Sequence, residues 1–162
     1  EIISINPFIV SDQNLISNTI SDLINKNKKI NFLVDKKNPF FDTMPDNSIS
    51  LINKNSIKDF EKRINKKIEY QRFRANIYFT GAEAWSERQW IGKTIRINNI
   101  NFFVTEEIPR CSATNLQPGT SNITINLPNL LKKTYDHINM GIFLIPQNDG
   151  NIFFDDEIKI ND

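Results

Sequence analysis

Reactive sulfur and imidazole are nearly absent from this chain of 162 residues, which has one cysteine, Cys111, and one histidine, His137. A single cysteine excludes an internal disulfide, and the two residues together exclude zinc sites built from several cysteines or histidines. A lone thiol is typical of a reducing compartment, so we expect a cytoplasmic protein. No apolar run is long enough to span a membrane, and no signal peptide is visible at the start. The first residue is Glu1, which indicates a trimmed terminus or a piece of a longer chain.

Charge of one sign is also scarce. The net charge is +1, and the lysines occur as scattered pairs (28–29, 36–37, 66–67 and 132–133) rather than as one stripe. This distribution argues against a nucleic-acid partner. Glycine and proline number 5 and 7, no repeat is visible, and hydrophobic residues make up 39% of the chain. The composition and length indicate one globular domain with its own core.

The hydrophobic pattern predicts mainly strands with attached helices. Helices are expected from Ser11 to about Lys26, from Ser56 to about Lys67, and over 127–135. Strands are expected over 30–34, 49–52, 72–80, 93–97, 100–108, 141–146 and 151–160, with a loop over 39–47. The pairs Asn98-Asn99 and Asp149-Gly150 predict two hairpins. We therefore expect an antiparallel β-barrel or tight sandwich over residues 46–162. Residues 1–45 would be a helix and strand region, either part of the same domain or a remnant of a longer chain.

Cys111 lies in a polar loop directly after a long apolar strand. A thiolate is the form that binds metal or attacks sulfur, and a neighbouring cation such as Arg110 favours that form. Hydroxyl and amide groups follow that could hold an anion or a metal-oxo group: Ser112, Thr114 and Asn115. The alternative is a free cysteine that only packs.

The segment 72–79 alternates as a strand, so one face would carry Arg72, Arg74, Asn76 and Tyr78. Two guanidinium groups and an amide on one face suit a phosphorylated ring system, because arginine matches phosphate geometry. The alternative is that the arginines pair with carboxylates such as Glu106 or Glu107.

His137 and the two tryptophans have ordinary alternatives. His137 could transfer protons, but a single histidine near a helix end is more often a cap or a surface residue. Trp85 and Trp90 are expected to seal the edge of the core rather than to stack on a ligand.

Four segments together resemble the MOSC family, named after the C-terminal domain of molybdenum-cofactor sulfurase. They are 48–53 (Ser-Ile-Ser-Leu-Ile-Asn), 72–77 (Arg-Phe-Arg-Ala-Asn-Ile), 90–93 (Trp-Ile-Gly-Lys) and 110–115 (Arg-Cys-Ser-Ala-Thr-Asn). The resemblance covers about residues 45–160. It implies a MOSC-type antiparallel β-barrel with a cysteine as its reactive centre.

The resemblance also implies a molybdenum cofactor (molybdopterin). In the amidoxime-reducing branch the cysteine ligates molybdenum, and in the sulfurase branch it is thought to pass sulfur to the cofactor. By position, Cys111 would be the metal ligand or sulfur carrier. The cofactor contacts would come from Arg72, Arg74, Asn76, Arg110, Ser112, Thr114 and Asn115.

Two functions follow as hypotheses, a molybdenum-dependent oxidoreductase with a redox partner, or a sulfur carrier. The carrier would accept a persulfide on Cys111 from a cysteine desulfurase. A third possibility is a scaffold that has lost its chemistry, because Gln117 precedes Pro118 where the family usually has aspartate. The first 45 residues do not resemble the N-terminal β-domain of longer family members.

Overall fold

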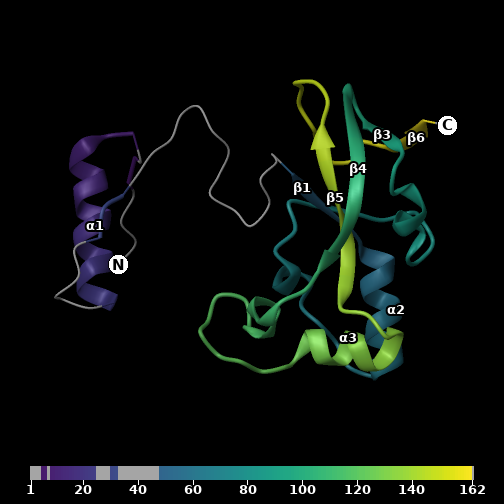
Figure 1. Ribbon diagram of the computed structural model, residues 1–162, viewed down its shortest axis with the longest axis horizontal. Helices are drawn as coiled ribbons and strands as arrows, with labels where there is room; N and C mark the ends of the chain where they lie inside the picture. Colours follow the sequence, from purple (N-terminus) through teal and green to yellow (C-terminus); the bar gives the residue numbers. More distant parts are fainter. Residues whose placement is uncertain (1–4, 7, 25–29, 33–47, 162) are drawn as a thin grey trace. The chain divides into compact units, whose positions relative to one another are not determined.

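The computed structural model describes residues 5–6, 8–24, 30–32 and 48–161 (Figure 1). The chain divides into two compact units, Glu1–Pro45 and Asp46–Asp162. In the first unit the predicted helix is confirmed as α1 (Val10–Ile24), which has no buried residue. Residues 30–32 form no strand, while the rest of the strand predicted over 30–34 and the loop predicted over 39–47 lie outside the described residues.

The second unit is built on one curled six-stranded sheet, which confirms a mainly β fold with attached helices (Figure 1). The strand order is β2-β1-β5-β4-β3-β6. The strands are β1 (Ile49–Asn53), β2 (Ile77–Phe79), β3 (Thr94–Ile97), β4 (Ile100–Pro109), β5 (Asn139–Pro146) and β6 (Ile158–Asn161). All neighbours are antiparallel except β1 and β2, which are parallel. The sheet is therefore mixed rather than purely antiparallel.

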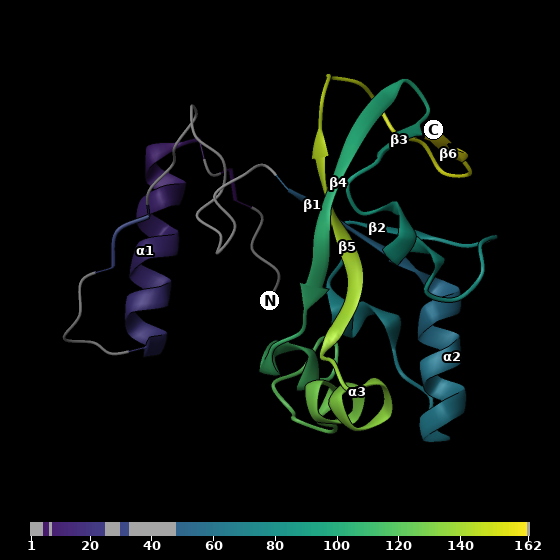
Figure 2. The same cartoon turned by 45° about the vertical axis from the view of Figure 1, so that its right-hand side comes forward.

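Strand β1 is apolar along most of its length because both of its faces are covered. Leu51 packs into one hydrophobic cluster with Ile95, Phe102 and Leu144, whereas its neighbour Ile52 packs into a second cluster. The second cluster is filled from helices α2 (Lys54–Ile64) and α3 (Leu127–Tyr135), by residues that include Ile57, Phe60, Leu127 and Leu131. The two helices thus cover one part of the sheet, toward the end where β4 finishes (Figure 2).

The hairpin predicted across Asn98-Asn99 is confirmed. β3 and β4 pair in register from Thr94↔Phe103 to Ile97↔Ile100, and Asn98 has the positive φ of 52° that its turn requires. The hairpin predicted across Asp149-Gly150 is wrong. Strand β6 is short and pairs with β3, with Ile95 opposite Ile160, instead of pairing with β5.

The strand predicted over 72–80 is also wrong in its first half. Residues Tyr70–Phe73 form a 3-10 turn, η1, and Arg74 follows in the left-handed conformation with φ 49°. Only Ile77–Phe79 form strand β2. The alternation of side chains does not apply to Arg72 and Arg74, because neither residue is in extended backbone. Arg72 is buried and Arg74 is exposed.

Candidate functional site

Cys111 lies where strand β4 ends and the chain turns into the 3-10 helix η3 (Ser112–Asn115). Its carbonyl oxygen accepts two hydrogen bonds from Thr114, one from the backbone N–H at 3.2 Å and one from the hydroxyl at 2.8 Å. Both bonds close the turn immediately after the cysteine. The thiol itself is exposed. It is therefore open to a ligand rather than enclosed in hydrocarbon.

Arg110, the residue before the cysteine, is held in place by the hydrogen bonds of its own side chain. Its side chain is buried, and its guanidinium donates to the carbonyl oxygen of Met140, from Nε at 2.8 Å and also from Nη2. Nη1 donates to the carbonyl oxygen of Phe73 at 3.0 Å, and the guanidinium carbon lies 5.5 Å from the Phe73 ring centroid. Burial lowers the pKa of Arg110 to about 10, against the opposing effects of Tyr78 and Cys111. The side chain therefore stays charged at neutral pH and ties β4 to β5 and η1.

Arg72 holds the other end of η3, at Asn115, through hydrogen bonds of its side chain. It is 5% exposed and donates to Glu69 Oε2 at 2.7 Å, to the carbonyl oxygen of Asn115 at 3.0 Å and to Thr124 Oγ1 at 2.7 Å. Asn115 is buried as well, and its side-chain oxygen accepts from the N–H of Leu127 at 2.9 Å. These bonds hold the end of η3 against both η1 and the start of α3.

Arg74, Asn76 and Ser112 differ from this group because their side chains are exposed. The side-chain oxygen of Asn76 accepts from Ser50, from its N–H at 2.9 Å and from its hydroxyl at 2.7 Å. That arrangement leaves the amide nitrogen of Asn76 to donate elsewhere. Within the described part of the chain, no hydrogen bond or ion pair engages the guanidinium of Arg74.

The predicted residues thus come together around two neighbouring turns. The guanidinium of Arg110, the residue before Cys111, donates to the carbonyl oxygen of Phe73, the residue before Arg74. The sequence alone did not separate the exposed group (Arg74, Asn76, Cys111 and Ser112) from the buried group (Arg72, Arg110, Thr114 and Asn115).

The alternative, that the arginines pair with carboxylates, holds for Arg72, although its partner is Glu69. Of the two carboxylates named for it, Glu107 pairs with Arg88 at 2.6 Å, and Glu106 has no ion pair among the described residues. Burial raises the pKa of Glu107, but hydrogen bonds from Arg88 and Asn139 outweigh that effect and hold it below its usual value. Sequence reasoning missed this cluster, because its members are far apart along the chain.

His137 belongs to the same cluster. Its Nε2 lies 3.1 Å from Arg88 Nη1, and its Nδ1 faces the N–H of Asn139 at 3.1 Å. Burial and the charge of Arg88 lower the pKa of His137. The ring also stacks on Tyr135, with centroids 5.7 Å apart. His137 is therefore not a surface residue. It is partly buried and makes structural contacts with Arg88, Asn139 and Tyr135.

The tryptophans lie in the core edge, as expected. Trp90 is buried in the first cluster, and Trp85 packs against the second while its Nε1 donates to Asp59 at 2.9 Å. Between them, Glu87 is a fully buried carboxylate that the sequence did not single out. It accepts hydrogen bonds from Ser56 at 2.7 Å and Asn53 at 3.3 Å.

No group of three or more histidine, cysteine, aspartate or glutamate side chains is arranged for a metal ion in the parts of the chain that the structure covers. Among the described helices, none combines the length and the apolar character needed to cross a bilayer.

Comparison with known proteins agrees with the sequence resemblance. Residues 37–159 match the family model of the MOSC domain. Over 87 residues the chain is 34% identical to mitochondrial amidoxime reducing component 2 of Rattus norvegicus and 30% identical to that of Bos taurus. Each match covers 54% of this chain but only 25% of the relative. The family match covers most of the second compact unit, including η1, Cys111 and η3. The chain belongs to the MOSC domain family.

Proposed function

We propose that this chain binds a molybdenum pterin cofactor through the thiolate of Cys111. The observation that carries the proposal is an exposed thiol at the start of η3 and, at the end of η1, an exposed guanidinium that has no partner among the described residues. Hydrogen bonds from Arg110 and Arg72 hold these two turns together. Soft thiolate suits a transition metal, and guanidinium suits phosphate. Membership of the MOSC family and similarity to proteins named amidoxime reducing component support this chemistry.

The exposed donors fit such a cofactor. Arg74 offers a planar set of N–H donors, and Asn76 offers an amide nitrogen whose orientation is fixed by the two bonds from Ser50 to its oxygen. Ser112 adds an exposed hydroxyl next to the thiol. A pterin ring and its phosphate are rich in acceptors, so donors of this kind are the expected complement.

The buried residues would act differently. Their side chains form hydrogen bonds within the protein, and we propose that these bonds hold the cysteine loop in place. The residues are Arg72, Arg110, Thr114 and Asn115. A thiol on a fixed loop needs no ordering when the ligand binds, and this preorganisation favours binding.

When bound, the cofactor would supply a metal centre at which an oxygen atom or two electrons can be transferred. On this proposal the chain is part of a molybdenum-dependent oxidoreductase that works with a redox partner protein. A reducing compartment, the cytoplasm by our prediction, would keep Cys111 as a free thiol. The chain aligns with a quarter of the length of its relatives, so the activity of a whole enzyme is part of the proposal.

The test is the molybdenum content of protein expressed with molybdate. Cys111→Ser should lose molybdenum while keeping its circular dichroism spectrum and its free energy of unfolding, because the thiol is exposed and makes no core contact. Lys133→Met, an exposed change on α3, is the matched control and should keep its molybdenum. Full molybdenum occupancy in the serine variant would refute thiolate ligation.

A sulfur carrier is the second candidate, and the exposure of the single thiol favours it equally. The thiolate of Cys111 would attack the terminal sulfur of a persulfide on a cysteine desulfurase. A new S–S bond would form at Cys111, and the desulfurase would leave as a thiolate. Incubation with the desulfurase and free cysteine should add the mass of one sulfur atom to the wild type and none to Cys111→Ser. An unmodified wild type would rule this candidate out.

A further inference from the structure

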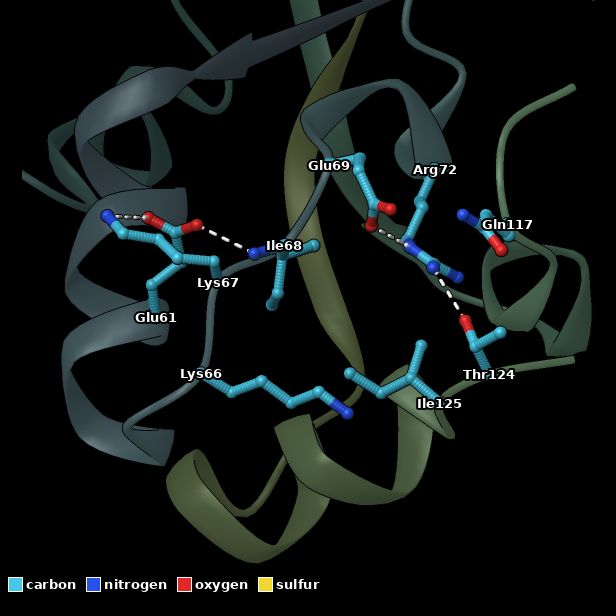
Figure 3. Close-up of a pocket in the computed structure, with 9 residues that line it drawn as sticks. All are labelled: Glu61, Lys66, Lys67, Ile68, Glu69, Arg72, Gln117, Thr124 and Ile125. Carbon is cyan, nitrogen blue, oxygen red and sulfur yellow. Dashed lines mark hydrogen bonds and ion pairs between the residues drawn. The ribbon is translucent and has the colours of Figure 1, made fainter.

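Two hollows adjoin at the C-terminal end of α2. The first, of about 390 Å³, is lined by Lys58, Glu61, Lys62, Asn65, Lys66 and Lys67. The second, of about 530 Å³, shares three of these residues and is also lined by Ile68, Glu69, Arg72, Gln117, Thr124 and Ile125 (Figure 3). Because the shared residues lie in both walls, the hollows form one elongated depression, which we call the α2 depression. Cys111 lines neither hollow.

The fold gathers lysines here that are spread along the sequence. Lys58 and Lys62 are one turn apart on the exposed face of α2, at a rise of about 6 Å. The helix is capped by Asn65 in the left-handed conformation, with φ 49°. The N–H of Lys66 then donates to the carbonyl oxygen of Glu61 at 3.1 Å. This turn folds Lys66 back against the last turn of the helix.

Both carboxylates in the lining already have a cation as partner. Glu61 pairs with Lys67 at 3.4 Å, and Glu69 pairs with Arg72 at 2.7 Å. Figure 3 shows both pairs as dashed contacts. The two carboxylates and their two partners therefore contribute no net charge to the depression.

Three ammonium groups are left over. In the part of the chain that the structure describes, no hydrogen bond or ion pair engages Lys58, Lys62 or Lys66. Figure 3 shows the side chain of Lys66 extending toward Ile125. The pKa of Glu69 is lowered mainly by its hydrogen bond from Arg72, and the charge of Lys66 adds to this effect. The depression as a whole is positive, so its complementary ligand is an anion.

The spacing of the lysines favours an anion with several separate charges. Side chains on alternate residues of an extended chain point to the same side and are about 6.6–6.8 Å apart. That interval is close to the rise of about 6 Å between Lys58 and Lys62. A peptide with carboxylates at every second residue can therefore place one carboxylate at each ammonium group. The elongated shape of the depression also suits an extended chain.

A compact anion such as a phosphate group fits less well. The depression lies at the C-terminal end of α2, where the helix dipole is negative and opposes a concentrated negative charge. Arg72, whose planar group would suit phosphate best, is buried and paired. The second hollow offers the partly buried side chains of Gln117 and Ile125, which can contact a peptide backbone and an apolar side chain.

We propose that the α2 depression docks an extended acidic segment of a partner protein. Carboxylates at alternate residues of that segment pair with Lys58, Lys62 and Lys66. The chain of the segment continues past Lys66 into the second hollow. This docking surface is separate from cofactor binding at Cys111, so either proposal can fail without the other.

The test is a titration of the ¹⁵N-labelled full chain at low ionic strength, followed by amide chemical shifts. The probe is a blocked heptapeptide with glutamate at its second, fourth and sixth positions and glycine elsewhere. It should shift the amide signals of Lys58, Lys62 and Lys66 in a saturable way, and added salt should weaken binding. A heptapeptide with its three glutamates in one block, and pyrophosphate, should both bind more weakly. No saturable shift, or equal or tighter binding of either comparison probe, would overturn the proposal.

A double variant locates the charges. Lys58→Gln/Lys62→Gln should weaken binding of the alternating peptide by about tenfold, because it removes two ion pairs. Glutamine has nearly the helix propensity of lysine, so α2 should keep its circular dichroism signal. Lys93→Gln/Lys159→Gln is the matched control, since it removes the same charge from two exposed lysines outside the depression and should bind as the wild type does. Equal affinities of the two double variants would show that binding follows net charge alone and would refute the assignment.

Discussion

Replacement of Gly141 by alanine tests the close approach of β5 to β1. Gly141 has a φ of +82°, and a Cβ added there would lie 2.5 Å from Ile52 Cγ1 and 2.6 Å from the carbonyl oxygen of Leu51. The left-handed backbone costs a side chain about 1 kcal/mol. Overpacking against a backbone atom that cannot rotate away adds about 1–3 kcal/mol. We expect Gly141→Ala to lower the free energy of unfolding by about 2–4 kcal/mol.

The matched control is Gly119→Ala. Gly119 has a similar φ of +74°, but no atom outside its chain neighbours lies within 4 Å of the added Cβ. It should therefore show only the backbone cost, about 1 kcal/mol. Urea unfolding followed by circular dichroism measures both variants, provided that their m-values stay equal to that of the wild type. Equal losses of stability in the two variants would refute the steric part of the reasoning.

Two further changes probe the hydrogen bonds of two buried charged groups, Arg72 and Glu87. Thr124→Val removes the hydroxyl that accepts from Arg72 at 2.7 Å, so we expect a loss of about 1–3 kcal/mol in urea unfolding and faster proteolysis of the segment 116–123; unchanged stability would show that the bond contributes nothing. Burial raises the pKa of Glu87 above 4.5, against the bonds from Ser56 and Asn53. The folded state therefore holds this proton more tightly than the unfolded state, and wild-type stability should fall as pH rises from 4.5 through the folded pKa. Glu87→Gln should lack this loss, so parallel pH profiles of unfolding for the two proteins would contradict the expectation.

Local patterns predicted the elements whose causes are local. The hairpin β3–β4 has a turn pair that accepts positive φ, flanked by strands of alternating apolar residues, and helix α3 has both its predicted ends. The strand predicted from Arg72 failed because its partners are distant in sequence. The buried guanidinium of Arg72 donates hydrogen bonds to Asn115 and Thr124, and no pattern within residues 72–80 indicates these partners.

The sequence predicted which residues lie at the candidate site, but not which of their side chains are exposed and which are buried. Arg110 and Cys111 are adjacent in sequence, yet one is buried against two carbonyl oxygens and the other is exposed. Composition and motif order cannot distinguish a guanidinium that binds a ligand from one that braces a loop. The pairing of β6 with β3 was missed for a related reason, because the turn signal at Asp149-Gly150 says nothing about which strand lies next to it.

The position of the single thiol at the entrance to η3 has a practical consequence. Because the chain has no other cysteine, a maleimide dye or a nitroxide would attach at Cys111 alone, with no background to remove by mutation. Such a reporter would lie in the chain between Arg110 and Asn115, whose hydrogen bonds hold the loop, and its signal would change if those bonds broke. The natural sequence is therefore ready for site-specific spectroscopy of its own loop.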